Sequence, residues 1–168
     1  MAGPVVASAV ILPLNCFIPG LADSKQLTPR QRDRLFVEIQ RLAIAIGVGC
    51  LDNEEIDRLN ILQATMLAMC QAIEEIRPLP DYVLVDGLQL PPISLPAEAI
   101  PKGDSLCQSI AAASVIAKVT RDRLLIELDK DYPHYGFQRH KGYGTLQHRQ
   151  AIARFGPCPI HRQSFKLQ

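Results

Sequence analysis

The sequence lacks the long hydrophobic run that a membrane protein needs. Among its 168 residues, no apolar stretch approaches the roughly 18 residues required to span a bilayer. The apolar segment Val5–Leu12 has no Lys or Arg before it, whereas a secretory signal begins with basic residues. We therefore expect no membrane association, and we interpret this segment as a buried strand.

Cysteine pairs and zinc motifs are also missing. The five cysteines include no Cys-x-x-Cys pair, and an odd number cannot all pair within one chain. The four histidines lack zinc-ligand spacing with cysteine or with one another. The sequence therefore predicts free thiols in a reducing, cytoplasmic location, and a domain stabilised by its own core rather than by disulfides or structural zinc.

A strong net charge is absent, because the chain carries only +1 overall, and this argues against a protein that simply coats a polyanion. The distribution is uneven, however. Residues 1–117 carry 8 Lys or Arg against 13 Asp or Glu, whereas residues 118–168 carry 10 against 4. This pattern is typical of carboxylates for a metal in the first part and phosphate contacts in the second, although an unevenly decorated neutral surface explains it equally well.

Strand and helix signals alternate along the chain and predict a single α/β domain. Thr28-Pro29 begins a helix whose apolar stripe reaches Ile46 and is closed by Gly47. The remaining elements are predicted as strands over 5–12, 48–51, 82–87 and 97–100, and as helices over 60–76, 105–128 and 145–155.

Asp86 follows the apolar run Val83–Val85 and precedes Gly87. A carboxylate at the carboxyl end of a buried strand lies where open α/β sheets collect their ligands, so Asp86 is a candidate metal ligand. A nucleotide-binding role is weak, because the chain has no Gly-x-x-x-x-Gly-Lys-Ser/Thr loop. The alternative is an aspartate that merely caps the turn before glycine.

Asp104 lies in Lys102-Gly103-Asp104-Ser105, at the predicted start of a long helix. Considered alone, it is best interpreted as a helix N-cap. A strand-end aspartate and a helix-start aspartate joined by an extended connection can nevertheless meet at one edge of a sheet. Together they would bind a hard cation through carboxylate oxygens.

A third candidate is the segment 135–145, in which basic residues alternate with aromatic residues and glycines. Such a loop suits contacts with phosphates and the stacking of a ring on a sugar or base. Long ordered loops in compact domains usually have a function. The sequence therefore predicts a nucleic-acid contact here.

Eight segments, in order along nearly the whole chain, resemble successive motifs of the ribonuclease HII family. They are Ala2–Ala7, Asp23–Leu27, Glu55–Leu62, Val85–Gly87, Lys102–Ser105, Ala111–Asp122, His140–Tyr143 and His161–Phe165. The resemblance implies a ribonuclease H-like mixed sheet flanked by helices. It also implies a two-metal Mg²⁺ or Mn²⁺ site that hydrolyses RNA/DNA hybrids and cuts 5′ of ribonucleotides embedded in duplex DNA, in a protein that we expect to be a monomer.

The resemblance assigns roles to individual residues. Asp86 and Asp104 are implied to be catalytic and to hold the metal. Tyr143 matches the family tyrosine that stacks beside the RNA-to-DNA junction. Three basic residues in matching segments are implied to contact the nucleic acid, namely Lys25, Lys141 and Arg162.

The resemblance also shows a departure. Family members carry, before the segment matching Ala2–Ala7, a central strand with an Asp-Glu pair followed by Gly-Arg-Gly, and here the sequence begins at Met1 after that point. We therefore expect an N-terminally truncated single domain over 1–168, with a start assigned at an internal methionine. The alternative is a catalytically silent form that retains a basic nucleic-acid-binding surface. If the assigned acids are misplaced, Asp23 and Glu98 are the next candidates.

Overall fold

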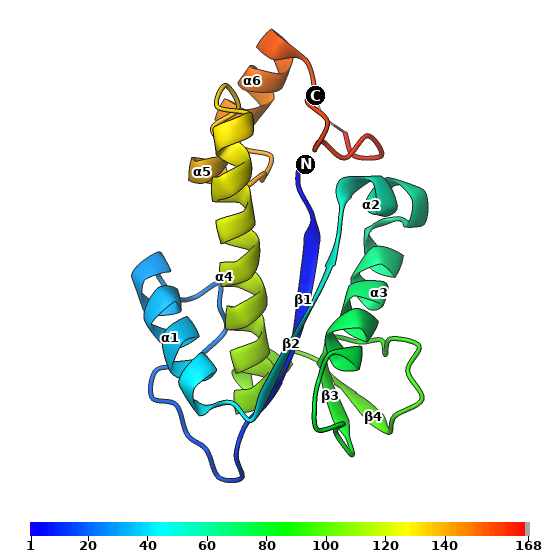
Figure 1. The fold of residues 1–168 in the computed structure, drawn as a ribbon. Helices are drawn as coiled ribbons and strands as arrows, with labels where there is room; N and C mark the ends of the chain where they lie inside the picture. The colour runs from blue at the N-terminus through cyan, green and yellow to red at the C-terminus, as the bar shows by residue number, and fades with distance from the viewer. Residues whose placement is uncertain (167–168) are drawn as a thin grey trace.

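The computed structural model describes residues 1–166, which form an α/β fold (Figure 1). Its strands are β1 (Val5–Ile11), β2 (Ala45–Leu51), β3 (Val83–Asp86) and β4 (Ala97–Ile100). Its helices are α1 (Pro29–Leu42), α2 (Asn53–Leu59), α3 (Ile61–Glu74), the 3-10 turn η1 (Gly103–Ser105), α4 (Gln108–Asp131), α5 (Phe137–His140) and α6 (Leu146–Phe155). The alternation of strands and helices predicted from the sequence is confirmed.

Strands β1 and β2 form an antiparallel pair, with Val5 opposite Leu51 and Ile11 opposite Ala45. This pair lies between α4 on one side and α3 on the other (Figure 1). Helix α3 approaches closely because β2 has glycine where the two elements meet. A Cβ atom on Gly49 would lie 1.9 Å from the Ala68 carbonyl oxygen, so no larger residue fits there.

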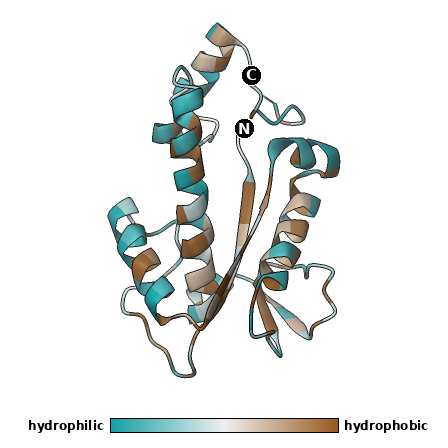
Figure 2. Cartoon of the chain, viewed as in Figure 1, coloured by the Kyte–Doolittle hydropathy of each residue, from teal (hydrophilic) through white to brown (hydrophobic). Residues whose placement is uncertain are grey.

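Strands β3 and β4 form a separate parallel pair, in which Asp86 is opposite Ile100. Among residues 1–166, no strand ladder joins this pair to β1 and β2. The predicted mixed sheet is therefore present as an antiparallel pair and a parallel pair. Figure 2 shows β1 as strongly hydrophobic, as expected for a strand covered on both faces, whereas most of α2 is hydrophilic.

The predicted boundary between the first helix and the second strand is wrong. Helix α1 begins as expected, with a capping box between Thr28 and Gln31, but it ends at Leu42 rather than at Gly47. Strand β2 begins at Ala45, because this segment pairs with β1 along its whole length. Ile46 continues the helical spacing of the stripe, yet ladder hydrogen bonds to a distant strand outweigh that local pattern.

Three apolar clusters stabilise the described chain: one between α1 and α4, one between the β1–β2 pair and helices α2 and α3, and one around α5 and α6. All five cysteines are free, as predicted, and Cys70 and Cys158 are buried. Within residues 1–166, no helix combines the length and the apolar character needed to cross a bilayer.

Candidate active site

Asp86 is the last residue of β3, as predicted, and its side chain is exposed. Its Oδ1 atom accepts a hydrogen bond of 2.8 Å from the backbone N–H of Gly103. The N–H of the next residue, Gly87, donates to the carbonyl of Ile100. The Asp86 carboxylate therefore bridges from β3 to the turn that carries Asp104.

Asp104 lies in the 3-10 turn η1, where only 8% of the residue is exposed. It does not cap the long helix, because α4 begins later, with Cys107 at its N-cap position. Burial raises the pKa of the Asp104 carboxyl, and repulsion from Asp86 and then from Asp23 raises it further, while Lys25 opposes the shift. Asp86 is thus close enough to Asp104 to influence the ionisation of the Asp104 carboxyl.

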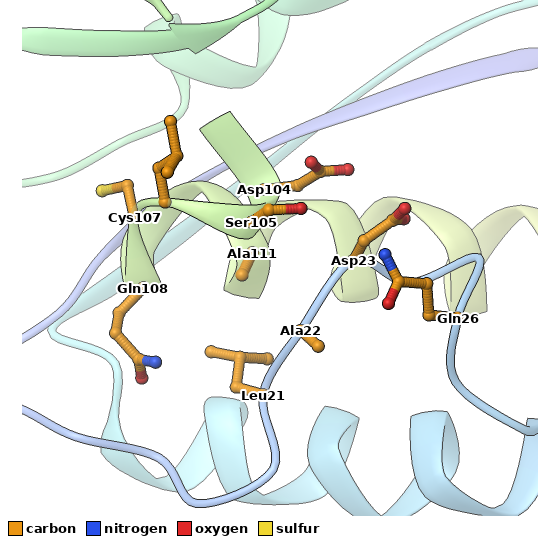
Figure 3. Close-up of a pocket in the computed structure, with 10 residues that line it drawn as sticks. Leu21, Ala22, Asp23, Gln26, Asp104, Ser105, Cys107, Gln108 and Ala111 are labelled. Carbon is orange, nitrogen blue, oxygen red and sulfur yellow. The ribbon is translucent and has the colours of Figure 1, made fainter. Parts of the chain in front are cut away.

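Asp23 adds a third acid to this region. It comes from the segment before α1, and together with Asp104 it lines a hollow of about 290 Å³. Figure 3 shows the two carboxylates on the same side of this hollow, with the Gln26 amide beside Asp23. The exposed side chain of Lys25 contributes a positive charge near Asp104, and its contact with nucleic acid stays a prediction.

The carboxylate oxygens of Asp86 and Asp104 are suitable ligands for a divalent cation. Carboxylate oxygens are the ligands that Mg²⁺ and Mn²⁺ prefer, and a cation beside Asp104 would relieve the repulsion that raises its pKa. Within residues 1–166, however, no three His, Cys, Asp or Glu side chains gather as a ligand set. Asp86 and Asp104 would therefore hold part of the coordination shell of such an ion, and they would not complete it.

Tyr143 lies on a separate surface beside α4, and 54% of the residue is exposed. Two cations approach its ring: the Lys118 ammonium lies 5.2 Å and the Arg121 guanidinium 5.3 Å from the ring centroid. Lys141 lies two residues before Tyr143, and its ammonium donates to the carbonyl of Gln138. An exposed ring among cations can stack on a nucleotide while the cations attract phosphate.

Arg162 is buried rather than exposed. Its guanidinium donates to the carbonyl oxygens of Gly3, at 3.0 Å, and Pro4, at 3.1 Å. Burial, together with repulsion from Arg121, lowers the pKa of Arg162 to about 10. The predicted contact of Arg162 with nucleic acid stays a prediction, because in this structure its donors are directed at the chain's own backbone.

Sequence reasoning missed two cations of this surface, Lys118 and Arg121. Arg121 donates to the carbonyls of Ala2, Pro4 and Lys141, so it joins the start of β1 to the Tyr143 loop. Lys118 pairs with Asp122 at 2.7 Å. Both lie on α4 with ordinary helical spacing, and only the tertiary structure reveals that they face Tyr143.

The arrangement of the β1–β2 pair between helices, with acids at the end of β3, defines the class of ribonuclease H-like enzymes. Ribonuclease H2 from Pyrococcus horikoshii OT3 superposes with a TM-score of 0.76 at 27% identity, over 99% of this chain and 88% of that chain. Bst-RNase HIII, solved in complex with Mn²⁺, has the same fold, with a TM-score of 0.68 at 17% identity over 99% of this chain and 63% of that one.

The sequence comparison narrows this class to one family. The family model of ribonuclease HII matches residues 1–168. Ribonuclease HII of Geobacter sulfurreducens is 58% identical over 166 residues, which are 99% of this chain and 76% of that protein. The chain therefore belongs to the ribonuclease HII family, whose members are hydrolases of RNA.

Proposed function

We propose that this chain is a divalent-metal-dependent endonuclease that hydrolyses the RNA strand of RNA/DNA hybrids and cuts 5′ of ribonucleotides embedded in duplex DNA. The observation that carries the proposal is the hydrogen bond from Gly103 to Asp86, which brings the strand-end carboxylate to the turn bearing Asp104. Two adjacent carboxylates at a strand end suit a site for a hard cation, and the family is one of ribonucleases.

In this proposal Asp86 and Asp104 hold Mg²⁺ or Mn²⁺ as part of a larger ligand set. A bound divalent ion would activate the attacking water and stabilise the leaving oxygen. The Gly103 amide keeps one Asp86 oxygen fixed and leaves the other free to bind. Lys25, beside Asp104, is placed to attract the phosphate toward these carboxylates.

Recognition of the substrate belongs to the Tyr143 surface. The exposed ring is proposed to stack beside the RNA-to-DNA junction, and Lys118, Arg121 and Lys141 supply positive charge for the neighbouring phosphates. Stacking is tolerant of base identity, so this arrangement suits an enzyme that recognises a sugar junction rather than a sequence.

The proposal is tested by comparing Met1–Gln168 with a version extended at its start by the family's Asp-Glu and Gly-Arg-Gly segment. Both are incubated with a DNA duplex containing one ribonucleotide and with an RNA/DNA hybrid, with Mg²⁺, Mn²⁺ or EDTA. We expect metal-dependent cleavage by the extended version, loss of that cleavage on Asp86→Asn, and far weaker cleavage and lower stability for Met1–Gln168 alone. Binding without cleavage by either protein would favour the catalytically silent alternative.

A further inference from the structure

Three buried histidines lie next to the Tyr143 loop, and the proposed function uses none of them. His140, from α5, is 8% exposed, whereas His148, from α6, and His161, from the segment after α6, are fully buried. The rings of His140 and His148 stack with their centroids 4.4 Å apart. Burying three ionisable rings together is costly unless each nitrogen has a suitable partner.

Two of the histidines bond directly to the backbone that carries Tyr143. His148 Nδ1 lies 2.8 Å from the Tyr143 carbonyl oxygen, which can only accept, so Nδ1 must carry a proton. His140 Nδ1 accepts from the N–H of Gly142 at 3.2 Å, so its proton lies on Nε2, which is 2.8 Å from the Tyr135 carbonyl. The N–H of Gly142 and the carbonyl of Tyr143 are therefore both held by imidazoles.

The third histidine fixes the direction of the remaining bond. His148 and His161 face each other through their Nε2 atoms at 3.0 Å. Because a neutral His148 has its proton on Nδ1, its Nε2 must accept, and His161 Nε2 must donate. His161 Nδ1 is then an acceptor from the backbone N–H of Cys158 at 2.9 Å, and the Cys158 thiol and carbonyl oxygen each lie 3.1 Å from the same nitrogen. The hydrogen bonds run in one direction from Cys158 through His161 and His148 to Tyr143.

In this direction, the relay requires both imidazoles to be neutral. A proton added to His148 would force His161 to reverse, with Nε2 accepting and Nδ1 donating to the Cys158 carbonyl oxygen at 3.1 Å instead of accepting from the Cys158 N–H. Burial agrees with this requirement, because it lowers the pKa of His148 to about 4 and also lowers the pKa of His161. At neutral pH the Tyr143 carbonyl therefore has a permanent donor.

We propose that His148 is a positioning residue for substrate recognition, which fixes the backbone of Tyr143 so that its exposed ring meets the nucleic acid in one orientation. This inference rests on the proposed role of Tyr143 as a substrate contact. The residue is 54% exposed, so burial does not hold its ring. The backbone of Tyr143 has to be fixed by buried neighbours. The rigid imidazole of His148 orders this backbone before the substrate binds, which reduces the entropy lost on binding.

The relay itself is tested by ¹⁵N NMR of the full chain labelled at histidine, at pH 7. Imidazole nitrogen shifts distinguish the two neutral tautomers. We expect a proton on Nδ1 of His148 and on Nε2 of both His140 and His161, with a coupling across the His161–His148 hydrogen bond. A proton on Nε2 of His148, or a charged ring, would overturn the inference whatever the protein's activity.

The positioning role is tested by binding to a DNA duplex with one ribonucleotide, in EDTA, so that the carboxylates and their metal do not contribute. We expect His148→Leu to weaken binding by about fivefold or more, His148→Asn to restore most of the affinity because its amide can donate to the same carbonyl, and His134→Leu to have no effect. His134 is the matched control, because it is exposed and stacks on Phe155 outside the relay.

A double-mutant cycle separates positioning from simple stability. If His148 acts through Tyr143, then His148→Leu should add no further loss in a Tyr143→Ala background. Additive losses would contradict the positioning role, as would unchanged binding by a folded His148→Leu protein when Tyr143→Ala does weaken it. If Tyr143→Ala itself leaves binding unchanged, the proposed substrate contact fails, and the tautomers measured by NMR still report separately on the relay.

Discussion

The two polar regions beside α4 are organised in opposite ways. At the start of the helix, burial raises the pKa of Asp104, and repulsion from Asp86 and Asp23 raises it further. Farther along the helix, around Tyr143, Arg121 alone donates to three backbone carbonyls, and the histidine relay has a donor for each acceptor, although Asp129 Oδ1, farther along α4, is buried without a partner within residues 1–166. The acidic region carries neighbouring like charges, whereas the hydrogen-bonding groups of the relay around Tyr143 have partners.

The two regions should therefore respond differently when a ligand binds. Binding of a cation removes the repulsion between neighbouring carboxylates. The free energy gained in this way strengthens metal binding. A satisfied region gains little from rearranging, so it can present Tyr143 in a fixed orientation.

The largest effect is expected for Asp86→Asn in the acidic region. The amide keeps the shape and can still accept from Gly103, but it loses the charge that binds the cation. In the extended version, cleavage should fall by more than about a hundredfold while the unfolding temperature stays nearly constant. Asp81→Asn is the matched control, since Asp81 is exposed in the segment before β3. Equal rates for Asp86→Asn and the parent would remove Asp86 from the site.

The second prediction uses acid to separate the regions. The unfolded chain protonates His148 near pH 6.5, whereas the folded chain does so only near pH 4. The contribution of His148 to stability is therefore constant above pH 6.5 and falls as the pH drops from about 6.5 to 4, by on the order of 3 kcal/mol. Denaturant unfolding at pH 7 and pH 5 should show the loss, and His148→Asn should show less of it.

The Asp104 carboxyl has the opposite effect on how stability depends on pH. Its folded pKa is raised, so the folded form binds its proton more tightly than the unfolded form, and acid relieves a cost at the start of α4. In Asp104→Asn this relief is absent, so the total loss of stability on acidification should be larger than in the parent. A smaller loss in Asp104→Asn would contradict the raised pKa of this carboxyl.

The sequence was sufficient to predict that Asp86 and Asp104 lie close together, but it did not predict the histidine relay beside Tyr143, for a physical reason. Asp86 and Asp104 are each adjacent to a local signal, a strand end and a glycine turn, so a local pattern indicated that they meet, even though Asp104 does not cap the helix. The three histidines have no common local signal. His140, His148 and His161 come from three elements, and only the packing of α5, α6 and the final segment brings them together.

A smaller effect is expected for Tyr143→Ala. A stacked ring contributes about 1–3 kcal/mol per nucleotide, and it should matter most where the substrate offers a single ribose. The extended version carrying Tyr143→Ala should lose more activity on a duplex with one ribonucleotide than on a continuous RNA/DNA hybrid. The ratio of the two rates is the measurement, and metal affinity should not change. Equal losses on both substrates would reduce Tyr143 to a packing residue.

The smallest effect is expected for Asp23→Asn, and its sign is the informative part. Asp23 repels Asp104, so removing its charge should lower the pKa of Asp104 and stabilise the folded chain at neutral pH by at most about 1 kcal/mol. The amide oxygen can still accept from the Lys25 N–H, so the local turn should persist. Carboxyl ¹³C NMR measures the pKa, and denaturant unfolding measures the stability. In the presence of Mg²⁺ or Mn²⁺ the gain should shrink or reverse, because the cation then provides the relief that Asp23→Asn mimics. A destabilised Asp23→Asn protein in the absence of metal would show that the acidic region is not under repulsive strain, and the contrast with the relay around Tyr143 would no longer hold.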